Sequence, residues 1–180
     1  VSLDENLKMI EESIRLLKAR GRRVFYDAEH FFDGYRANHA YCLKTIRVAE
    51  EAGAETIVLC DTNGGSLPHD VTRIVHDARR TVRVPLGIHA HNDCELAVAN
   101  SVAAVQAGCR QVQGTINGYG ERCGNADLTA IIPVLCLKMG IGCLPSKKLK
   151  ELTEVSRFVA EVSNMSQRPG QPFVGATAFA

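Results

Sequence analysis

Apolar residues recur along this chain in two alternating patterns, helical spacing and short continuous runs. Residues 2–21 repeat an apolar position every three or four residues, which is typical of an amphipathic helix. Ser2 and Glu5 fit a capping box at its start, and Gly21 fits its C-terminal end. The expected apolar stripe consists of Leu3, Leu7, Ile10, Ile14 and Leu17.

Four short apolar runs, each followed by a helical pattern, predict strands of a parallel α/β sheet. The strands are expected to begin near Val24, Thr56, Leu86 and Gln111. The helices that follow them are expected at about 35–52, from Pro68 to 80, at 94–107 and at 128–139.

The pattern changes after residue 143. Residues 146–165 predict one more amphipathic helix, with an apolar stripe of Leu149, Leu152, Val155, Val159 and Val162. The last 15 residues begin like a loop and end on apolar side chains. We therefore expect two parts, residues 1–143 and residues 144–180.

Composition and charge narrow the classes of partner. Hydrophobic residues make up 46% of the chain, charged residues 23%, and the formal net charge is +1. This balance gives no reason to expect nucleic acid or a membrane as partner. No apolar run approaches 18 residues, and the charged, amphipathic beginning is unlike a signal peptide.

The seven cysteines are odd in number, and none is spaced as C-x-x-C. Several lie in apolar runs. We expect them to be mostly buried free thiols in a reducing, cytoplasmic compartment.

Polar residues stand where each predicted strand ends. In chain order they are Asp27 and Glu29, then Asp61 and Thr62, then His89 and His91, then Asn117. Ligands of parallel α/β folds meet the carboxyl ends of the strands, so four successive units point to one site.

His89 and His91 are the strongest chemical signal of this set. At positions i and i+2 of a strand their side chains point the same way, so two imidazoles can share a cation. The alternative is a pair of solvated histidines at a strand end. Amidohydrolase barrels also use His-x-His, but they carry further histidines on later strands, and the run at 111–118 has none.

The glycine-rich segment GYGERCGN, residues 118–125, does not have the spacing of a dinucleotide fingerprint. It fits better as a tight loop that presents Glu121, Arg122 and Asn125 to a site. Glu121 and Arg122 fit a structural ion pair equally well. Cys123 has no histidine partner in the sequence, so a nucleophilic role is not expected.

Five segments together resemble the family of 2-isopropylmalate and homocitrate synthases, and within it the citramalate synthase branch. They are DAEHFFDGY, LCDTNGGSLP, GIHAHND, LAVANSVAAVQAGCRQVQGTINGYGERCGNADL and FVGATAFA. The resemblance covers essentially the whole chain. The isopropylmalate branch more usually has FSxED and DTVG where this chain has FYDAEHFFDGY and LCDTNGG.

The resemblance implies a TIM (β/α)8 barrel, of which residues 1–143 would supply the C-terminal half, strands five to eight. Residues 144–180 would begin a helical linker subdomain. The implied reaction condenses acetyl-CoA with a 2-keto acid at a divalent metal ion (Mn, Mg or Zn). Pyruvate would give citramalate, on a route to isoleucine, and the alternatives are the 2-isopropylmalate and homocitrate reactions.

Site residues follow from the same resemblance, position by position. His89, His91 and Asn125 would lie at the metal ion, Thr62 would hold the carboxylate of the keto acid, and Glu29 would stand beside the substrate as a catalytic group. Glu95 stands where the family often has glycine.

The family's first-strand Arg-Asp-Gly motif, which supplies a metal ligand, is not in this chain, and no general base is evident. The chain therefore resembles an internal piece of a longer enzyme, expected to act as a homodimer. The lyase branch of the family, which cleaves 3-hydroxy-3-methylglutaryl-CoA, is a further alternative. A hypothesis of another class is a non-catalytic half-barrel that at most binds metal or associates with other chains.

Overall fold

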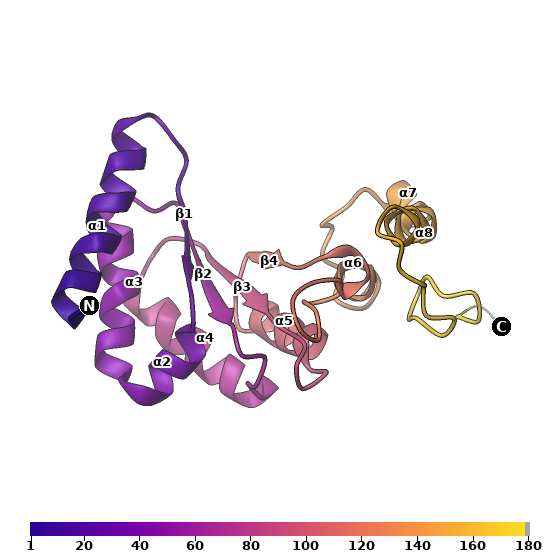
Figure 1. Cartoon of the computed structure of the whole chain (residues 1–180), viewed down its shortest axis with the longest axis horizontal. Coiled ribbons are helices and arrows are strands. Elements are labelled where there is room, and N and C mark those ends of the chain that lie inside the picture. The colour runs from indigo at the N-terminus through magenta and orange to yellow at the C-terminus, as the bar shows by residue number, and fades with distance from the viewer. Residues whose placement is uncertain (179–180) are drawn as a thin grey trace. The chain divides into compact units, whose positions relative to one another are not determined.

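The computed structural model describes residues 1–178 and contains two compact units, residues 1–113 and 114–180. The first unit is a parallel α/β structure, coloured from indigo to magenta in Figure 1. Its elements are α1 (Leu3–Ala19), β1 (Phe25–Ala28), α2 (Phe31–Ala37), α3 (His39–Ala52), β2 (Thr56–Asp61), α4 (Pro68–Thr81), β3 (Leu86–Ala90), α5 (Ala97–Gln106) and β4 (Gln111–Gln113).

The four strands form one sheet in the order β1-β2-β3-β4, and every neighbouring pair is parallel. Each strand lies close to the run that predicted it. A helix follows each of the first three strands before the chain returns to the sheet, which is the connection that parallel strands require. The sequence-based prediction of four parallel strands with helices is confirmed.

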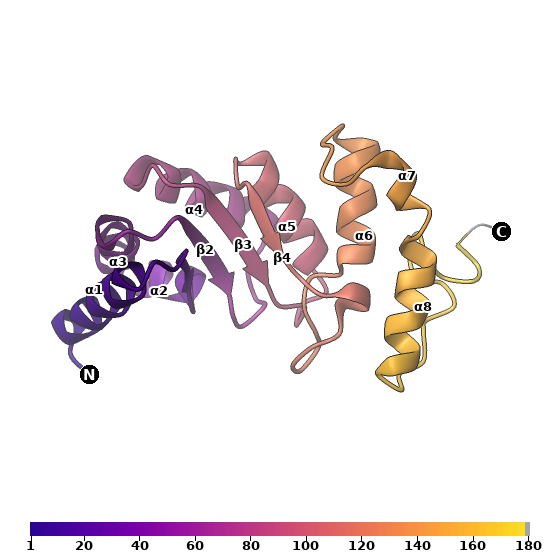
Figure 2. The same ribbon diagram turned by 90° about the horizontal axis from the view of Figure 1, so that it is seen from above.

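The register separates the two faces of the sheet, because residues paired across parallel strands point to the same side. One face is apolar, and Figures 1 and 2 show α3, α4 and α5 along one side of the sheet. Residues of the apolar face include Ile57, Leu59 and Ile88, all with no exposed surface. The opposite face, called here the inner face, carries Asp27, Val58, Cys60, Gly87, His89, Gln111 and Gln113, and Glu29 follows directly after β1.

Helix ends follow local sequence signals in most places. The Ser2 side chain accepts a hydrogen bond from the Glu5 N–H, Pro68 opens α4, and Gly53 ends α3 with φ at 106°. The predicted helix at 35–52 is two helices, because the Asn38 side chain caps a new helix at His39. Glu95 adopts a positive φ of 57°, so α5 begins three residues later than expected.

The stripe predicted on α1 is only partly buried. Leu7 and Ile14 are buried, whereas Leu3 and Leu17 are 55% and 44% exposed. Helix α1 packs mainly against α3, so only the middle of the stripe is covered by another element.

The second unit is helical. Its elements are η1 (Ile116–Gly118), α6 (Leu128–Pro133), the π-helix η2 (Val134–Lys138), α7 (Ser146–Leu149) and α8 (Leu152–Val162). The single helix predicted at 146–165 is therefore two helices. Its buried line is Leu152, Ser156 and Ala160, and the expected stripe was wrong at Val155 and Val162, which are 40% and 70% exposed.

The expected division at residue 143 remains a prediction. The last two residues of the expected second part, 179 and 180, lie outside the described residues. Those two residues also end the FVGATAFA segment.

All seven cysteines are free thiols, but the expectation that most are buried was wrong. Only Cys42, Cys60 and Cys109 are buried. In residues 1–178 no helix combines the length and the apolar character needed to cross a membrane.

Candidate functional site

The carboxyl ends of the strands in the first unit bring the expected residues together in two pairs. Glu29 follows β1 and Thr62 follows β2, and the Thr62 hydroxyl donates a hydrogen bond of 2.7 Å to Glu29 Oε2. His89 lies on β3 and His91 just beyond it, with ring centroids 5.2 Å apart and planes inclined by 35°. The sequence prediction that these side chains share a strand edge is consistent with both contacts.

The two histidines differ in their surroundings. His91 is 9% exposed, and its Nδ1 is buried without a hydrogen-bond partner in residues 1–178. His89 is half-buried, and its Nδ1 lies 2.7 Å from Gln113 Oε1 on β4. The alternative of two solvated surface histidines does not describe His91.

Gln113 connects His89 to the far edge of the sheet. Its Nε2 lies 3.1 and 3.2 Å from the two carboxylate oxygens of Asp27 on β1. Sequence reasoning did not single out Gln113. The signal that could have found it is the pair of polar residues Gln111 and Gln113, which stand two apart and so share one face of β4.

Hydrogen bonds with His30 and Glu29 orient the Thr62 hydroxyl. It accepts a hydrogen bond of 2.8 Å from the backbone N–H of His30 and donates its proton to Glu29. His30 reaches this position in a left-handed conformation, with φ at 56°. The loop after β1 therefore fixes the direction in which the Thr62 hydroxyl points.

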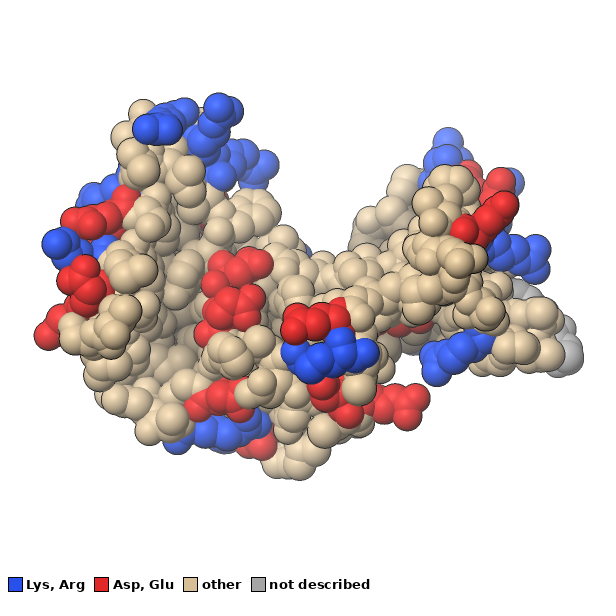
Figure 3. Space-filling view, viewed as in Figure 1, with Lys and Arg blue, Asp and Glu red and all other residues tan. Residues whose placement is uncertain are grey.

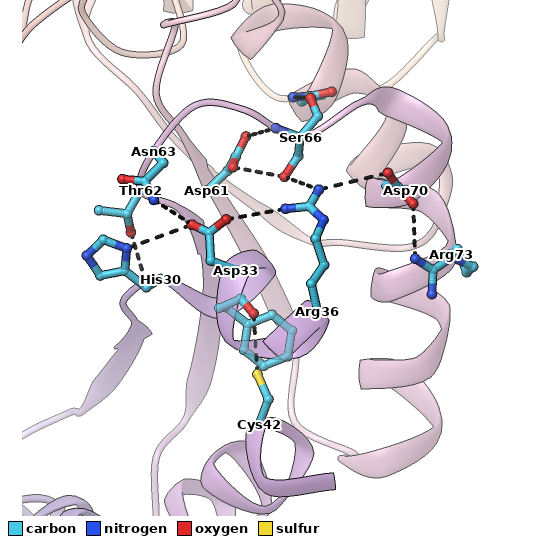
Figure 4. Close-up of polar contacts among 12 residues, drawn as sticks. His30, Asp33, Arg36, Cys42, Asp61, Thr62, Asn63, Ser66, Asp70 and Arg73 are labelled. Carbon is cyan, nitrogen blue, oxygen red and sulfur yellow. Dashed lines mark hydrogen bonds and ion pairs between the residues drawn. The ribbon is translucent and has the colours of Figure 1, made fainter. Parts of the chain in front are cut away.

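A polar network supports the loops beside this pair (Figure 4). Asp61, only 1% exposed, accepts hydrogen bonds from the Ser66 N–H and hydroxyl at 3.2 and 2.9 Å. The Arg36 guanidinium donates to Ser66 Oγ at 3.1 Å and forms ion pairs with Asp33 and Asp70. Asp61 was expected to face a ligand at the strand ends, but its carboxylate instead accepts hydrogen bonds from the loop after β2.

The loops after β2 and β3 lock together at Gly64. A Cβ added there would lie 2.6 Å from Asp93 Oδ2, 2.8 Å from Asp93 N and 2.9 Å from His91 O. The Gly64 carbonyl also accepts a hydrogen bond from the Cys94 N–H at 3.3 Å. Only glycine allows this approach, at a φ of 63°.

Charge is distributed unevenly over the first unit. Figure 3 shows acidic side chains gathered in its middle, and basic side chains at the connection from α1 to β1. The exposed basic residues of that connection are Arg20, Arg22 and Arg23, whereas Asp27 and Glu29 are exposed at the carboxyl end of β1. The strand end thus carries charge that suits a cation.

Asn125 lies in the second unit, in the loop before α6. Its N–H donates to the Gly118 carbonyl at 2.9 Å, which closes the glycine-rich segment into a tight loop as expected. Glu121 and Arg122 form an ion pair of 3.5 Å. The role of Asn125 at a metal ion stays a prediction.

Within residues 1–178 no three or more His, Cys, Asp or Glu side chains converge as a metal site would require. The two imidazoles lie side by side in the first unit, and one of them has an unpartnered buried nitrogen. This arrangement fits part of a metal site, to which further ligands must be added.

The chain resembles known proteins along most or all of its length. Residues 1–159 match the HMGL-like family. The (R)-citramalate synthase of Geobacter sulfurreducens is 54% identical over 180 residues, which cover 100% of this chain and 34% of that protein. The 2-isopropylmalate synthase of Methanocaldococcus jannaschii is 36% identical over 179 residues, 99% of this chain and 34% of that protein.

Among solved structures, an HMG-CoA lyase of Bacillus subtilis matches with a TM-score of 0.76 and 21% identity, over 92% of this chain and 58% of that chain. This likeness shows the fold, part of a TIM barrel. The chain spans about a third of the length of the curated relatives it matches.

Proposed function

This chain belongs to the HMGL-like family, and we propose that it is part of an enzyme that condenses acetyl-CoA with a 2-keto acid. The observation that carries the proposal is the 54% identity to a citramalate synthase along the whole chain, against 36% to a 2-isopropylmalate synthase. We therefore propose pyruvate as the acceptor. Acetyl-CoA, pyruvate and water would give citramalate, CoA and a proton, on a route to isoleucine.

His89 and His91 are the proposed metal ligands, with Asn125 as a third candidate from the second unit. Enzymes of this family generally depend on a divalent metal ion. The side-by-side imidazoles and the orphaned Nδ1 of His91 support the fit. A divalent ion (Mn, Mg or Zn) bound there would supply Lewis-acid polarisation of the keto group.

Thr62 is proposed to bind the carboxylate of the keto acid, and Glu29 is proposed to stand beside the substrate as a catalytic group. The Thr62 hydroxyl now donates its single proton to Glu29 Oε2, while the His30 N–H holds the oxygen. A substrate carboxylate at Thr62 would take the place of Glu29 as the acceptor of that proton. Glu29 would then face the substrate, in the catalytic position proposed for it.

Product analysis distinguishes condensation with pyruvate from the lyase reaction of the family and from condensation with larger keto acids. With full-length enzyme from the source, we expect citramalate and CoA from pyruvate by mass spectrometry, and slower turnover of 2-ketoisovalerate. Faster turnover of 2-ketoisovalerate would overturn the choice of pyruvate. Thr62→Val should raise the KM for pyruvate, and Thr72→Val, which lies on α4, should leave it unchanged.

A non-catalytic half-barrel is the second candidate for the 180-residue chain by itself, because it spans about a third of its relatives. The expected result for this chain alone is no pyruvate-dependent release of CoA, while a divalent ion still binds. Turnover by the chain alone would contradict it. We also propose a homodimer in a cytoplasmic compartment, which gel filtration and cell fractionation would test.

A further inference from the structure

Three side chains from three strands form a continuous hydrogen-bonded series on the inner face. The Asp27 carboxylate lies beside Gln113 Nε2, and Gln113 Oε1 lies beside His89 Nδ1. All three residues belong to the first unit. Neither Asp27 nor Gln113 has a part in the proposed function described so far.

The series crosses the whole sheet. β1 and β4 are its two outer strands, so three strand spacings of about 4.8 Å would separate their backbones by roughly 14 Å in a flat sheet. Contacts of 3.1 and 3.2 Å between their side chains show that the sheet curves toward the inner face. Curvature therefore brings an acid on the first strand to a glutamine on the last.

The carboxylate fixes the orientation of the Gln113 amide. An ionised carboxylate can only accept hydrogen bonds, so the amide NH2 of Gln113 must face Asp27. The amide oxygen then faces His89, 2.7 Å from Nδ1. Because that oxygen can only accept, His89 Nδ1 must carry the proton.

A neutral imidazole with its proton on Nδ1 has its lone pair on Nε2, and a metal ion binds through such a lone pair. We propose that Gln113 and Asp27 are positioning residues that hold His89 in the Nδ1–H tautomer and so prepare its Nε2 for a divalent cation. The part of this inference that concerns the metal ion rests on the proposed function. The part that concerns the His89 tautomer does not. His91 has no such partner at Nδ1, so the proposal separates the two histidines.

The first test reads the tautomer directly in the metal-free, 180-residue chain. Long-range 1H–15N NMR spectra, assigned with His89→Ala, should show His89 as the Nδ1–H form. Gln113→Met removes the acceptor at nearly constant size and should shift His89 toward the Nε2–H form. An Nε2–H His89 in the unaltered chain, or no shift in Gln113→Met, would overturn the proposal.

Gln111→Met is the matched control, since Gln111 lies on the same strand and face. Its Oε1 is buried without a hydrogen-bond partner in residues 1–178, so the substitution removes no bond from the series. It should leave the His89 tautomer unchanged. Asp27→Ala is a second variant that keeps Gln113 but frees its amide to turn, and it should give a mixture of the two forms.

The second test titrates Mn²⁺ or Zn²⁺ into the same chains by calorimetry. Loss of an outer partner of a metal-bound histidine weakens metal binding by about 10–100-fold, and this loss is expected for Gln113→Met but not for Gln111→Met. Equal affinities would overturn the positioning role. If the unaltered chain bound neither ion, the metal part of the proposed function would fail, and the NMR result would still decide the tautomer.

Discussion

The two faces of the sheet carry different chemistry on the same four strands. On the apolar face, Ile57, Leu59 and Ile88 have no exposed surface. On the inner face, Asp27 is exposed and His89 is half-buried, each with a polar partner. The difference teaches that one face holds the fold together while the other is available for binding, so substitutions on the two faces should have separable effects.

The largest expected effect concerns the cysteines. Burial raises the pKa of Cys42 and of Cys109 from 9.0 to about 12, so each is about a thousandfold less ionised than an ordinary thiol. Burial, with the nearby carboxylates of Glu29 and Asp27, also raises the pKa of Cys60 on the inner face. Exposed Cys94 should react with iodoacetamide much faster than these three buried thiols, as followed by peptide mass spectrometry.

The thiol prediction also includes a control, since denaturation should make all seven cysteines reactive. Rapid labelling of Cys60 in the folded chain would contradict the packed arrangement beneath the carboxylates.

Adjacent residues of β3 give the sharpest test of the two faces. Ile88→Ala should lower the free energy of unfolding by about 2–5 kcal/mol, because it leaves a cavity against the helices. His89→Ala should lower it by about 1 kcal/mol through the lost hydrogen bond to Gln113, while metal binding is abolished. Urea unfolding measures both, and similar losses of stability in the two variants would break the comparison.

Asp61 tests whether a polar residue can belong to the structural face. Asp61→Ala should cost about 1–3 kcal/mol, because the Ser66 N–H and hydroxyl lose their buried acceptor. Its metal affinity should remain within threefold of the original. The control is Asn63→Ala, an exposed side chain bound to Asp33, for which thermal unfolding should change little.

The smallest effect is expected from Glu55, on the surface near α1. Hydrogen bonds from Lys18 and Arg23 lower the pKa of its carboxyl below 4.5. The folded state therefore gains stability above the unfolded pKa, and this gain is lost as the pH falls through the lower, folded value. Glu55→Gln should reduce the difference in stability between pH 7 and pH 3 slightly, and an increase would contradict the sign.

The sequence predicted the strands because each is a short apolar run closed by turn residues. It also placed Glu29, Thr62, His89 and His91 at the strand ends, from their positions alone. Gln113 was missed because its partner Asp27 is 86 residues away and only the curvature of the sheet brings them together. Such a contact leaves no periodic signal in the chain.

Helix boundaries were less predictable where single residues redirect the backbone. Periodicity does not reveal the positive φ of Glu95, which delays α5. Pro133 lacks an N–H, and the helix continues after it as a π-helix over Val134–Lys138. The capping signal of Asn38 was readable in the sequence, but the apolar pattern around it is continuous enough to hide the break.

Because of the close approach at Gly64, the loops after β2 and β3 cannot be exchanged independently in protein engineering. A loop carrying Thr62 from another enzyme would bring any side chain at position 64 against His91 and Asp93. Loop grafting to change substrate choice should therefore succeed only when both loops are transferred together, or when the graft keeps glycine at position 64.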